Sequence, residues 1–197
     1  MADDAGVMDY INGMGCAGRE GCKLLQKKLL QQNPDIYLGG KQALNEDNTN
    51  SGFNRGHLNP NGHHAVPSRN ATFTLTNVVP QNSTLNQNAW NKHESKLTSL
   101  FNANCHQAYV LVGAIPSSNW IIKNSVKRVN IPEYTWNAYC CVTQNGRPIL
   151  SGAATALNTE LNVVVERTLD EMVDFLQQFS DAPVNELFNV NANLRVF

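Results

Sequence analysis

The residue types best suited to chemistry lie in segment 54–60, which reads Asn-Arg-Gly-His-Leu-Asn-Pro. The surrounding stretch is rich in glycine, asparagine, serine and proline, which predicts a polar loop. A neutral imidazole in such a loop, that of His57, can take a proton from water near neutral pH. Arg55 can hold a phosphate through two parallel hydrogen bonds. Because phosphodiester hydrolysis needs a base and positive charge beside the phosphate, this pair predicts phosphoryl chemistry with His57 as the base.

A second group of candidates comprises Asn86, Trp90 and Glu94, which are spaced four residues apart. They fall in a segment expected to form one helix from Ser83 to about residue 102, so they would lie along one face of it. The amide oxygen of Asn86 and the carboxylate of Glu94 are hard ligands of the kind magnesium takes while keeping several waters. We therefore expect this helix to present a cation ligand and a nearby carboxylate, with Trp90 as its anchor.

Each of these candidates also has an interpretation without function. A single histidine in a loop is usually just exposed, and Asn86 fits a surface position near a helix cap. Glu94 fits a solvated helix charge, and Trp90 fits the core under either interpretation. Only the ordered combination of these residues favours catalysis.

The elements expected around these residues are strands interrupted by a few helices. Alternating polar and apolar residues predict a half-buried strand over 71–79 that ends at Pro80. Thr168-Leu-Asp-Glu171 is a capping-box pattern that predicts the start of a helix, and Asn145-Gly146 predicts a hairpin turn. The remaining strands are predicted at 109–112, 120–122, 128–131, 134–143 and 149–154. This order predicts an α+β fold with a mostly antiparallel central sheet and flanking helices.

Length and composition indicate a single domain over residues 21–197, preceded by a mobile lead-in of residues 1–20 and opening with a short helix over 22–32. A chain of 197 residues with 42% hydrophobic content can bury a substantial core. No apolar run approaches the roughly 18 residues of a membrane-spanning helix, so no membrane partner is expected.

Charge is unevenly distributed although the net charge is only −1, which argues against binding through one large positive field. Residues 41–128 hold eight Lys and Arg against three acids, whereas residues 129–197 hold three against eight. This difference is either random or the sign of a basic surface formed by the middle of the chain.

Five cysteines are present, which leaves at least one thiol without a partner in the chain: Cys16, Cys22, Cys105, Cys140 and Cys141. The adjacent Cys140 and Cys141 would point to opposite faces of a strand, so they are expected to have different partners. Cys16 and Cys22 could close a small loop. The cysteine content and the sequons at Asn70 and Asn82 favour a secreted protein, although residues 1–20 lack the regions of a signal peptide.

Three segments follow one another in a distinctive order, namely Asn54-Arg-Gly-His57, Asn77-Val-Val-Pro-Gln81 and Asn86-Gln-Asn-Ala-Trp90-Asn-Lys-His-Glu94. This order resembles the DNA/RNA non-specific endonuclease family, which carries a ββα-metal or His-Me finger. The family signature is Asp-Arg-Gly-His, Asn-x-x-Pro-Gln and Asn-x-x-x-Trp-x-x-x-Glu, and the spacing matches throughout. Segment 130–141 also looks like a later strand of the endonuclease domain-containing 1 branch. The resemblance implies a ββα-metal motif over about 52–103.

The resemblance implies a magnesium-dependent hydrolase of DNA and RNA, with manganese or another divalent cation as possible substitutes. It places the general base on His57, the metal-binding asparagine on Asn86 and a carboxylate near the water shell of the metal on Glu94. The other matches are motif residues expected to hold the phosphate or to support the site, namely Arg55, Asn54, Asn77 and Gln81. Contacts to the DNA and RNA backbone would give little base specificity.

One departure from the signature leaves alternatives open. Asn54 stands where the family has aspartate, and a lost carboxylate could leave neighbouring site groups without an acceptor. The chain could then be a catalytically weakened relative that binds nucleic acid or another partner. His63 and His64, together with His57, leave a zinc site as a further alternative, and a cysteine-based enzyme is a third.

Overall fold

The computed structural model describes residues 43–65 and 68–188, which form two compact units. The first unit contains the described residues up to Gln81 together with Ser117–Ile131. The second contains Asn82–Pro116 and the described residues from Pro132 onwards. The predicted lead-in of residues 1–20, the predicted helix over 22–32 and the cysteines Cys16 and Cys22 lie outside the described residues. The single domain over 21–197 stays a prediction.

The first unit consists of short elements connected by turns. Its strands form two antiparallel pairs, β1 (Asn54–His57) with β2 (Val78–Gln81) and β4 (Trp120–Lys123) with β5 (Val126–Asn130). Asn124 and Ser125 both have positive φ, as the tight turn between β4 and β5 requires. The helices among the described residues of this unit are short: α3 (Asn45–Asn48), η2 (Asn61–His63), η3 (Ser68–Phe73) and η4 (Leu75–Asn77).

A buried ion pair fastens α3 to the β4–β5 hairpin. Arg128 Nε donates to Asp47 Oδ1 at 2.8 Å, and Arg128 Nη2 donates to Asp47 Oδ2 at 3.1 Å. Asp47 is 2% exposed, so this paired geometry compensates for the burial of its charge. Burial, the largest single influence, raises the pKa of Asp47. The hydrogen bonds from Arg128 and from the Leu44 amide together outweigh it, so the pKa lies below its usual value.

The strand predicted over 71–79 is wrong for most of its length. Two 3-10 helices, η3 and η4, occupy this segment, and β2 begins only at Val78. Hydroxyl groups explain the difference, because Thr72 Oγ1 donates to the carbonyl of Arg69 at 2.8 Å, closing a local turn that competes with a strand. Pro80 lies within β2 instead of ending it, which a two-stranded ribbon tolerates.

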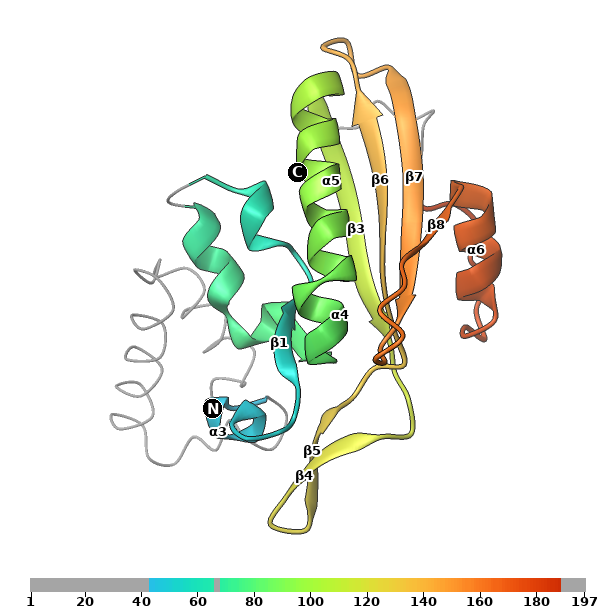
Figure 1. The fold of residues 1–197 in the computed structure, drawn as a ribbon. Helices are drawn as coiled ribbons and strands as arrows, with labels where there is room; N and C mark the ends of the chain where they lie inside the picture. Colours follow the sequence, from blue (N-terminus) through green and yellow to red (C-terminus); the bar gives the residue numbers. More distant parts are fainter. Residues whose placement is uncertain (1–42, 66–67, 189–197) are drawn as a thin grey trace, which may run out of the picture. The chain divides into compact units, whose positions relative to one another are not determined.

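The second unit is built around a four-stranded antiparallel sheet with the order β3-β6-β7-β8 (Figure 1). Its strands are β3 (Gln107–Ile115), β6 (Tyr134–Val142), β7 (Pro148–Leu157) and β8 (Val165–Arg167). All five strands predicted after residue 104 are confirmed, because each coincides wholly or in part with one of β3, β4, β5, β6 and β7. The predicted hairpin at Asn145-Gly146 is confirmed as the connection between β6 and β7. The predicted α+β fold with a mostly antiparallel sheet is confirmed as well.

Two helices cover opposite faces of this sheet. On one face, His93 of α5 (Ala89–Asn104) bonds to Asn137 of β6. On the other face, Met172 and Phe175 of α6 (Leu169–Gln177) pack against the next residue of β6, Ala138. Adjacent strand residues point to opposite faces, so the sheet lies between α5 and α6. The capping box predicted for α6 is confirmed at Thr168.

The helix predicted from Ser83 to about residue 102 is divided in two. Helix α4 (Ser83–Gln87) and helix α5 are separated at Asn88, where φ is −117° and ψ is −91°. The amide of Ala89 donates to Asn162 Oδ1 at 2.9 Å, a side chain 73 residues away in the sequence. This partner replaces the hydrogen bond that a continuous helix would form at Ala89.

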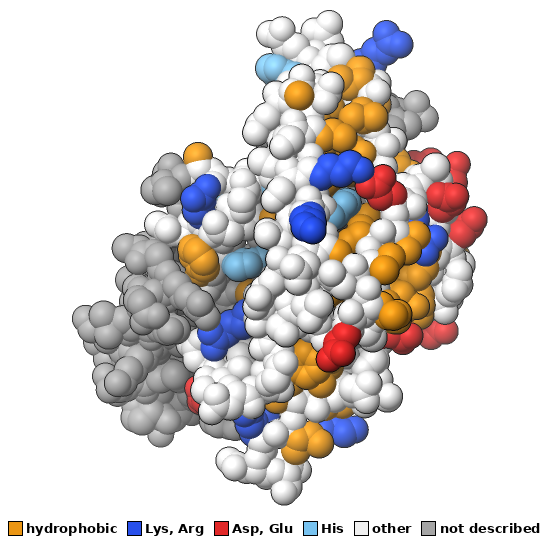
Figure 2. Space-filling model, in the orientation of Figure 1, with side chains coloured by type: hydrophobic (Ala, Val, Ile, Leu, Met, Phe, Trp, Pro, Cys, Tyr) orange, Lys and Arg blue, Asp and Glu red, His pale blue; other side chains and the backbone are white. Residues whose placement is uncertain are grey.

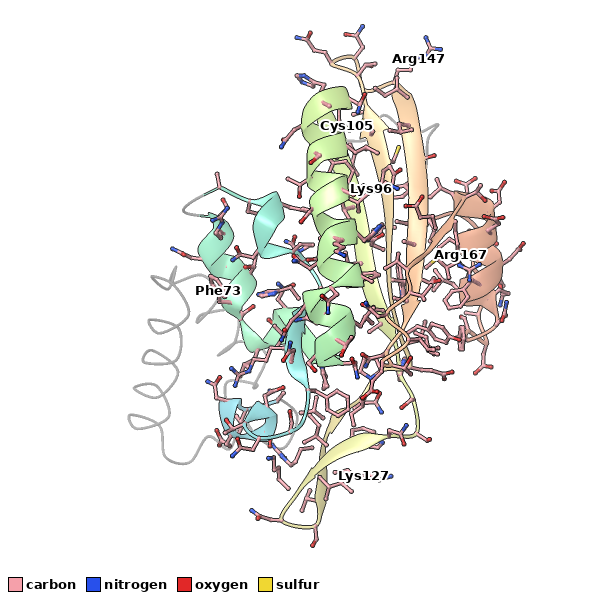
Figure 3. The ribbon with its side chains drawn as sticks, viewed as in Figure 1. Phe73, Lys96, Cys105, Lys127, Arg147 and Arg167 are labelled. Carbon is pink, nitrogen blue, oxygen red and sulfur yellow. A yellow bond between two sulfur atoms is a disulfide. The ribbon has the colours of Figure 1, made fainter. Side chains whose placement is uncertain are left out.

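A disulfide joins Cys105, which follows α5, to Cys141 of β6 (Figure 3). The adjacent Cys140 is fully buried and is the free cysteine among the described residues. The expectation that Cys140 and Cys141 differ in their partners is confirmed. In the described part of the chain, no helix is long and apolar enough to span a bilayer.

Removing this disulfide should destabilise the second unit. In the double variant Cys105→Ala and Cys141→Ala, the 36-residue separation between the two positions is no longer closed in the unfolded chain. The free energy of unfolding should fall by about 3 kcal/mol, measured by urea denaturation. Dithiothreitol should lower the stability of the parent chain by about this amount more than that of the variant, which lacks the bridge between positions 105 and 141; an equal response of both proteins would contradict the assignment.

Candidate active site

Strand β1 places Arg55 and His57 on the same face, two residues apart. In the register of the pair, Arg55 lies opposite Pro80 and His57 lies opposite Val78. The polar loop expected around His57 is therefore wrong, because pairing with β2 draws this segment into a strand. His57 remains partly exposed at the end of that strand.

Gly56 is required by the close approach of Gln81 on the other face of the pair. A Cβ atom at residue 56 would lie 2.7 Å from Cβ of Gln81, which is closer than two carbon atoms can pack. Gln81 is 1% exposed and fills this space. The Arg-Gly-His order thus has a steric cause: only glycine between Arg55 and His57 leaves room for the glutamine.

Asn77 fastens the chain that leaves β1 directly after His57. Its Oδ1 accepts from the amide of Asn59 at 2.9 Å, and its Nδ2 donates to the carbonyls of Asn59 and Thr72, both at 3.0 Å. The amide of Leu58 also donates to the carbonyl of Asn77 at 2.9 Å. These hydrogen bonds hold the backbone next to His57 in place. The functional role of Asn77 stays a prediction.

The surroundings of His57 and Arg55 include one aromatic ring and one backbone carbonyl. The rings of His57 and Phe73 meet edge to face, with centroids 5.8 Å apart. Arg55 Nη2 donates to the carbonyl of Asn45 at 3.1 Å, which links β1 to α3. A guanidinium group carries five N–H donors in a planar fork, a geometry that matches the oxygen atoms of a phosphate.

Asn54 lies on the opposite face of β1 from His57. It pairs with Gln81 in the register, and it precedes the histidine by three positions, an odd offset that places the two side chains on opposite faces of a strand. The aspartate that the family carries at this position would share that face. The substitution therefore does not change the residues that flank the imidazole on its own face.

In the second unit, Asn86 and Glu94 belong to the two separate helices α4 and α5. The expectation that one straight helix face carries both is wrong, because the break at Asn88 intervenes. The side chain of Asn86 is partly exposed and forms no hydrogen bond with any described residue. Its carboxamide oxygen is thus available to a cation.

Trp90 connects the two helices to the sheet and contacts Glu94. It is 5% exposed and packs in a cluster with Leu85 of α4 and Ala156 of β7, so the predicted anchor is present. Its side chain also hydrogen-bonds the carboxylate of Glu94. Burial raises the pKa of Glu94 to about 7, and this hydrogen bond offsets part of the rise.

Sequence reasoning missed the two asparagines that position α4. Asn158 Oδ1 accepts from the amide of Asn82, the residue that caps α4, at 2.7 Å. Asn162 caps the start of α5 at Ala89. Both asparagines follow β7, so the segment after that strand fixes both ends of the helix that carries Asn86. The positive φ of Asn162 reflects a tight turn, for which asparagine is suited, but no local pattern reveals its partner.

The oxygen ligands of Asn86 and Glu94 fit magnesium better than the histidines fit zinc. No group of three or more His, Cys, Asp or Glu residues that could hold a metal occurs within 43–65 and 68–188. His64 Nε2 instead bonds to Asn59 Oδ1 at 2.7 Å. The zinc alternative built on His57, His63 and His64 therefore finds no support.

Acidic side chains gather over α6 on the second unit (Figure 2), including Asp170 and Glu171 in its first turn. A phosphate backbone is repelled by such a surface. On α5, Lys96 forms an exposed ion pair with Glu166. The uneven charge seen in the sequence thus marks the α6 side of this unit as unsuited to nucleic acid.

An antiparallel strand pair with Arg55 and His57 on one face, followed in the chain by helices with Asn86 and Glu94, is the order of elements expected of the ββα class of nucleases. The chain belongs to the DNA/RNA non-specific endonuclease family, whose model matches residues 30–187. This match confirms the family resemblance.

Curated relatives include the endonuclease domain-containing 1 protein of Homo sapiens, 33% identical over 114 residues, which are 55% of this chain and 21% of that protein. Human mitochondrial endonuclease G is 41% identical over 76 residues, which are 38% of this chain and 25% of that protein. The matched part is thus a quarter or less of the length of these relatives.

A solved structure, "Crystal structure of the EndoG/EndoGI complex: Mechanism of EndoG inhibition", has a TM-score of 0.56 and 19% sequence identity. The likeness covers 74% of this chain and 62% of that chain. At this identity it establishes a shared fold.

The partly buried carboxyl of Glu94 should make stability depend on pH. Its pKa in the folded protein, about 7, is above the ordinary 4.5, so the folded state holds a proton that the unfolded chain releases. The free energy of unfolding should fall by an amount on the order of 3 kcal/mol as pH rises from about 4.5 to 7. In Glu94→Gln, measured by urea denaturation with chelator present, this fall should disappear.

Exposed Glu160 provides the matched control, because Glu160→Gln should keep the pH dependence of the parent. Burial lowers the pKa of His93, which adds an opposite slope, but it does so equally in all three proteins. An unchanged pH profile in Glu94→Gln would contradict the burial of this carboxyl.

Loss of the Asn162 cap should weaken the α4–α5 junction. Asn162→Ala removes the acceptor at Ala89 and should cost about 1 kcal/mol of stability. Hydrogen exchange of the amides of Asn86 and Ala89 should speed up, while that of α6 should not. Unchanged exchange at Ala89 would show that the cap does not hold the junction.

Proposed function

We propose that the chain is a divalent-cation-dependent, sugar-non-specific endonuclease that hydrolyses phosphodiester bonds of DNA and RNA. The observation that carries the proposal is the presentation of Arg55 and His57 on one face of β1, a strand whose opposite face is packed by Gln81 against Gly56. Membership of the DNA/RNA non-specific endonuclease family supports it.

In the proposed reaction, His57 takes a proton from a water molecule as the water oxygen forms a bond to phosphorus. The bond from phosphorus to the leaving oxygen breaks, and Arg55 holds the phosphate through its guanidinium N–H groups. Phe73, packed against the imidazole, limits the orientations of its ring. Asn77 fixes the chain after the histidine and so restrains its position.

Asn86 and Glu94 would hold a magnesium ion, Asn86 by its amide oxygen and Glu94 through the water shell. Bound there, the ion would act as a Lewis acid toward the phosphate and leaving oxygens. Manganese, with similar ligand preferences, should substitute for it. The carboxamide of Asn86, which bonds to no described residue, suits a cation ligand. A bound cation would also lower the raised pKa of Glu94 and so favour its ionised carboxylate.

We also propose that the protein functions in an oxidising, extracellular environment, as the disulfide between Cys105 and Cys141 favours. The alternative of a weakened relative that only binds nucleic acid rested on Asn54. Since Asn54 lies on the face of β1 opposite His57, it gives this alternative little support.

Substitution of the base tests the proposal. His57→Ala should reduce the nicking of plasmid DNA and the cleavage of RNA by at least about 100-fold, because it removes the proton acceptor. Exposed His106 supplies the control, since His106→Ala should retain the parental rate. Chelator should abolish cleavage by the parent, and magnesium or manganese should restore it. A parental rate in folded His57→Ala would refute the assignment.

A further inference from the structure

The first unit contains a cavity of about 410 Å³ that the proposed reaction does not use. Asn77 forms part of its wall, and the other lining residues are all small or polar: Asn59, His64, Ser68, Ala71, Thr72 and Thr74. Its volume falls in the range of small-ligand sites, about 300–1,000 Å³. Among the described residues, no lysine, arginine, aspartate or glutamate lines it, so the hydrogen-bonding groups that these residues offer carry no fixed charge.

The cavity adjoins the segment that carries His57. Phe73, which packs against the imidazole, lies in the chain between the lining residues Thr72 and Thr74. On the strand side, Asn77 precedes Val78, the register partner of His57. All of these residues belong to the first unit, so the cavity and the proposed base share one framework.

Several lining groups are open to a ligand. Asn59 Oδ1 accepts a hydrogen bond from His64 Nε2 at 2.7 Å, so Nδ1 of the neutral ring is left as an acceptor. The Nδ2 group of Asn59 and the hydroxyl of Ser68 bond to no described residue. The cavity thus offers two N–H donors, one ring-nitrogen acceptor and a hydroxyl that can act as either.

We propose that this cavity binds one nucleobase of a single-stranded segment of the substrate, adjacent to the phosphate on which His57 acts. The proposal rests on the nuclease function proposed above and adds a substrate preference to it. Donors and acceptors on uncharged groups match the edge of a base, whereas a phosphate would call for cationic partners.

Single strands are preferred because a base in a duplex has its pairing edge occupied and its faces stacked. Such a base must leave the stack to enter a cavity, which costs free energy that an unpaired base does not spend. The cavity would bind bases of both DNA and RNA, because the lining groups would form hydrogen bonds to the base and not to the sugar.

Filling the cavity tests the proposal in a cleavage assay. Ala71→Phe places a ring in the cavity, and Ala65→Phe adds the same ring at an exposed position outside the lining. Ala71→Phe should slow cleavage of a single-stranded oligonucleotide about tenfold and change plasmid nicking by less than about twofold. Ala65→Phe should match the parent on both. Equal cleavage of single strands by all three proteins would overturn the proposal.

A binding experiment without cleavage tests the cavity independently of nuclease activity. It can therefore succeed or fail whether or not the chain is a nuclease. With chelator present, adenosine and uridine should shift the NMR signals of Ala71, Thr72 and His64 in the parent and in Ala65→Phe, but not in Ala71→Phe. Inorganic phosphate should leave these signals in place. Shifts caused by phosphate, or none caused by either nucleoside, would overturn the proposal even in an active nuclease.

Discussion

The fit of the Gln81 side chain against Gly56 is the constraint on which the proposed catalytic face depends. Two strands of only four residues each could pair in more than one register. A buried glutamine that occupies the space of a missing Cβ selects one register, and that register sets Arg55 opposite Pro80 and His57 opposite Val78. The Arg-Gly-His and Pro-Gln segments, which are distant in the sequence, thus fit together sterically through Gly56 and Gln81.

The proposed cation site depends on a different interaction, which is the capping of its short helix by side chains distant in the sequence. Helix α4 is a single short turn that would have little stability alone. Asn158 and Asn162, at either side of one turn after β7, supply hydrogen bonds at both of its ends. Trp90 adds an apolar contact to Leu85 beneath it. The geometry of Asn86 is therefore set by the sheet of its own unit.

Features that depend on local patterns were predictable from the sequence. The strands after residue 104 follow from runs of apolar residues with Gly and Pro between them, and α6 follows from its capping box. Features decided by distant partners were not. The segment 71–79 alternates like a strand but forms 3-10 turns, and the division at Asn88 reflects a side chain far along the chain. The spacing of the motif residues identified the candidate site. The steric need for Gly56 and the cavity near the segment of His57 depend on contacts between distant residues, which no local pattern reveals.

The most direct test of the account is anomalous diffraction from crystals of the chain containing manganese. We expect one principal manganese peak bonded to Oδ1 of Asn86, at about the 2.1 Å typical of a small octahedral cation, with waters in most other positions. In crystals of Asn86→Leu this peak should vanish. A strong peak held by other side chains, with Asn86 making no contact to it, would contradict the account.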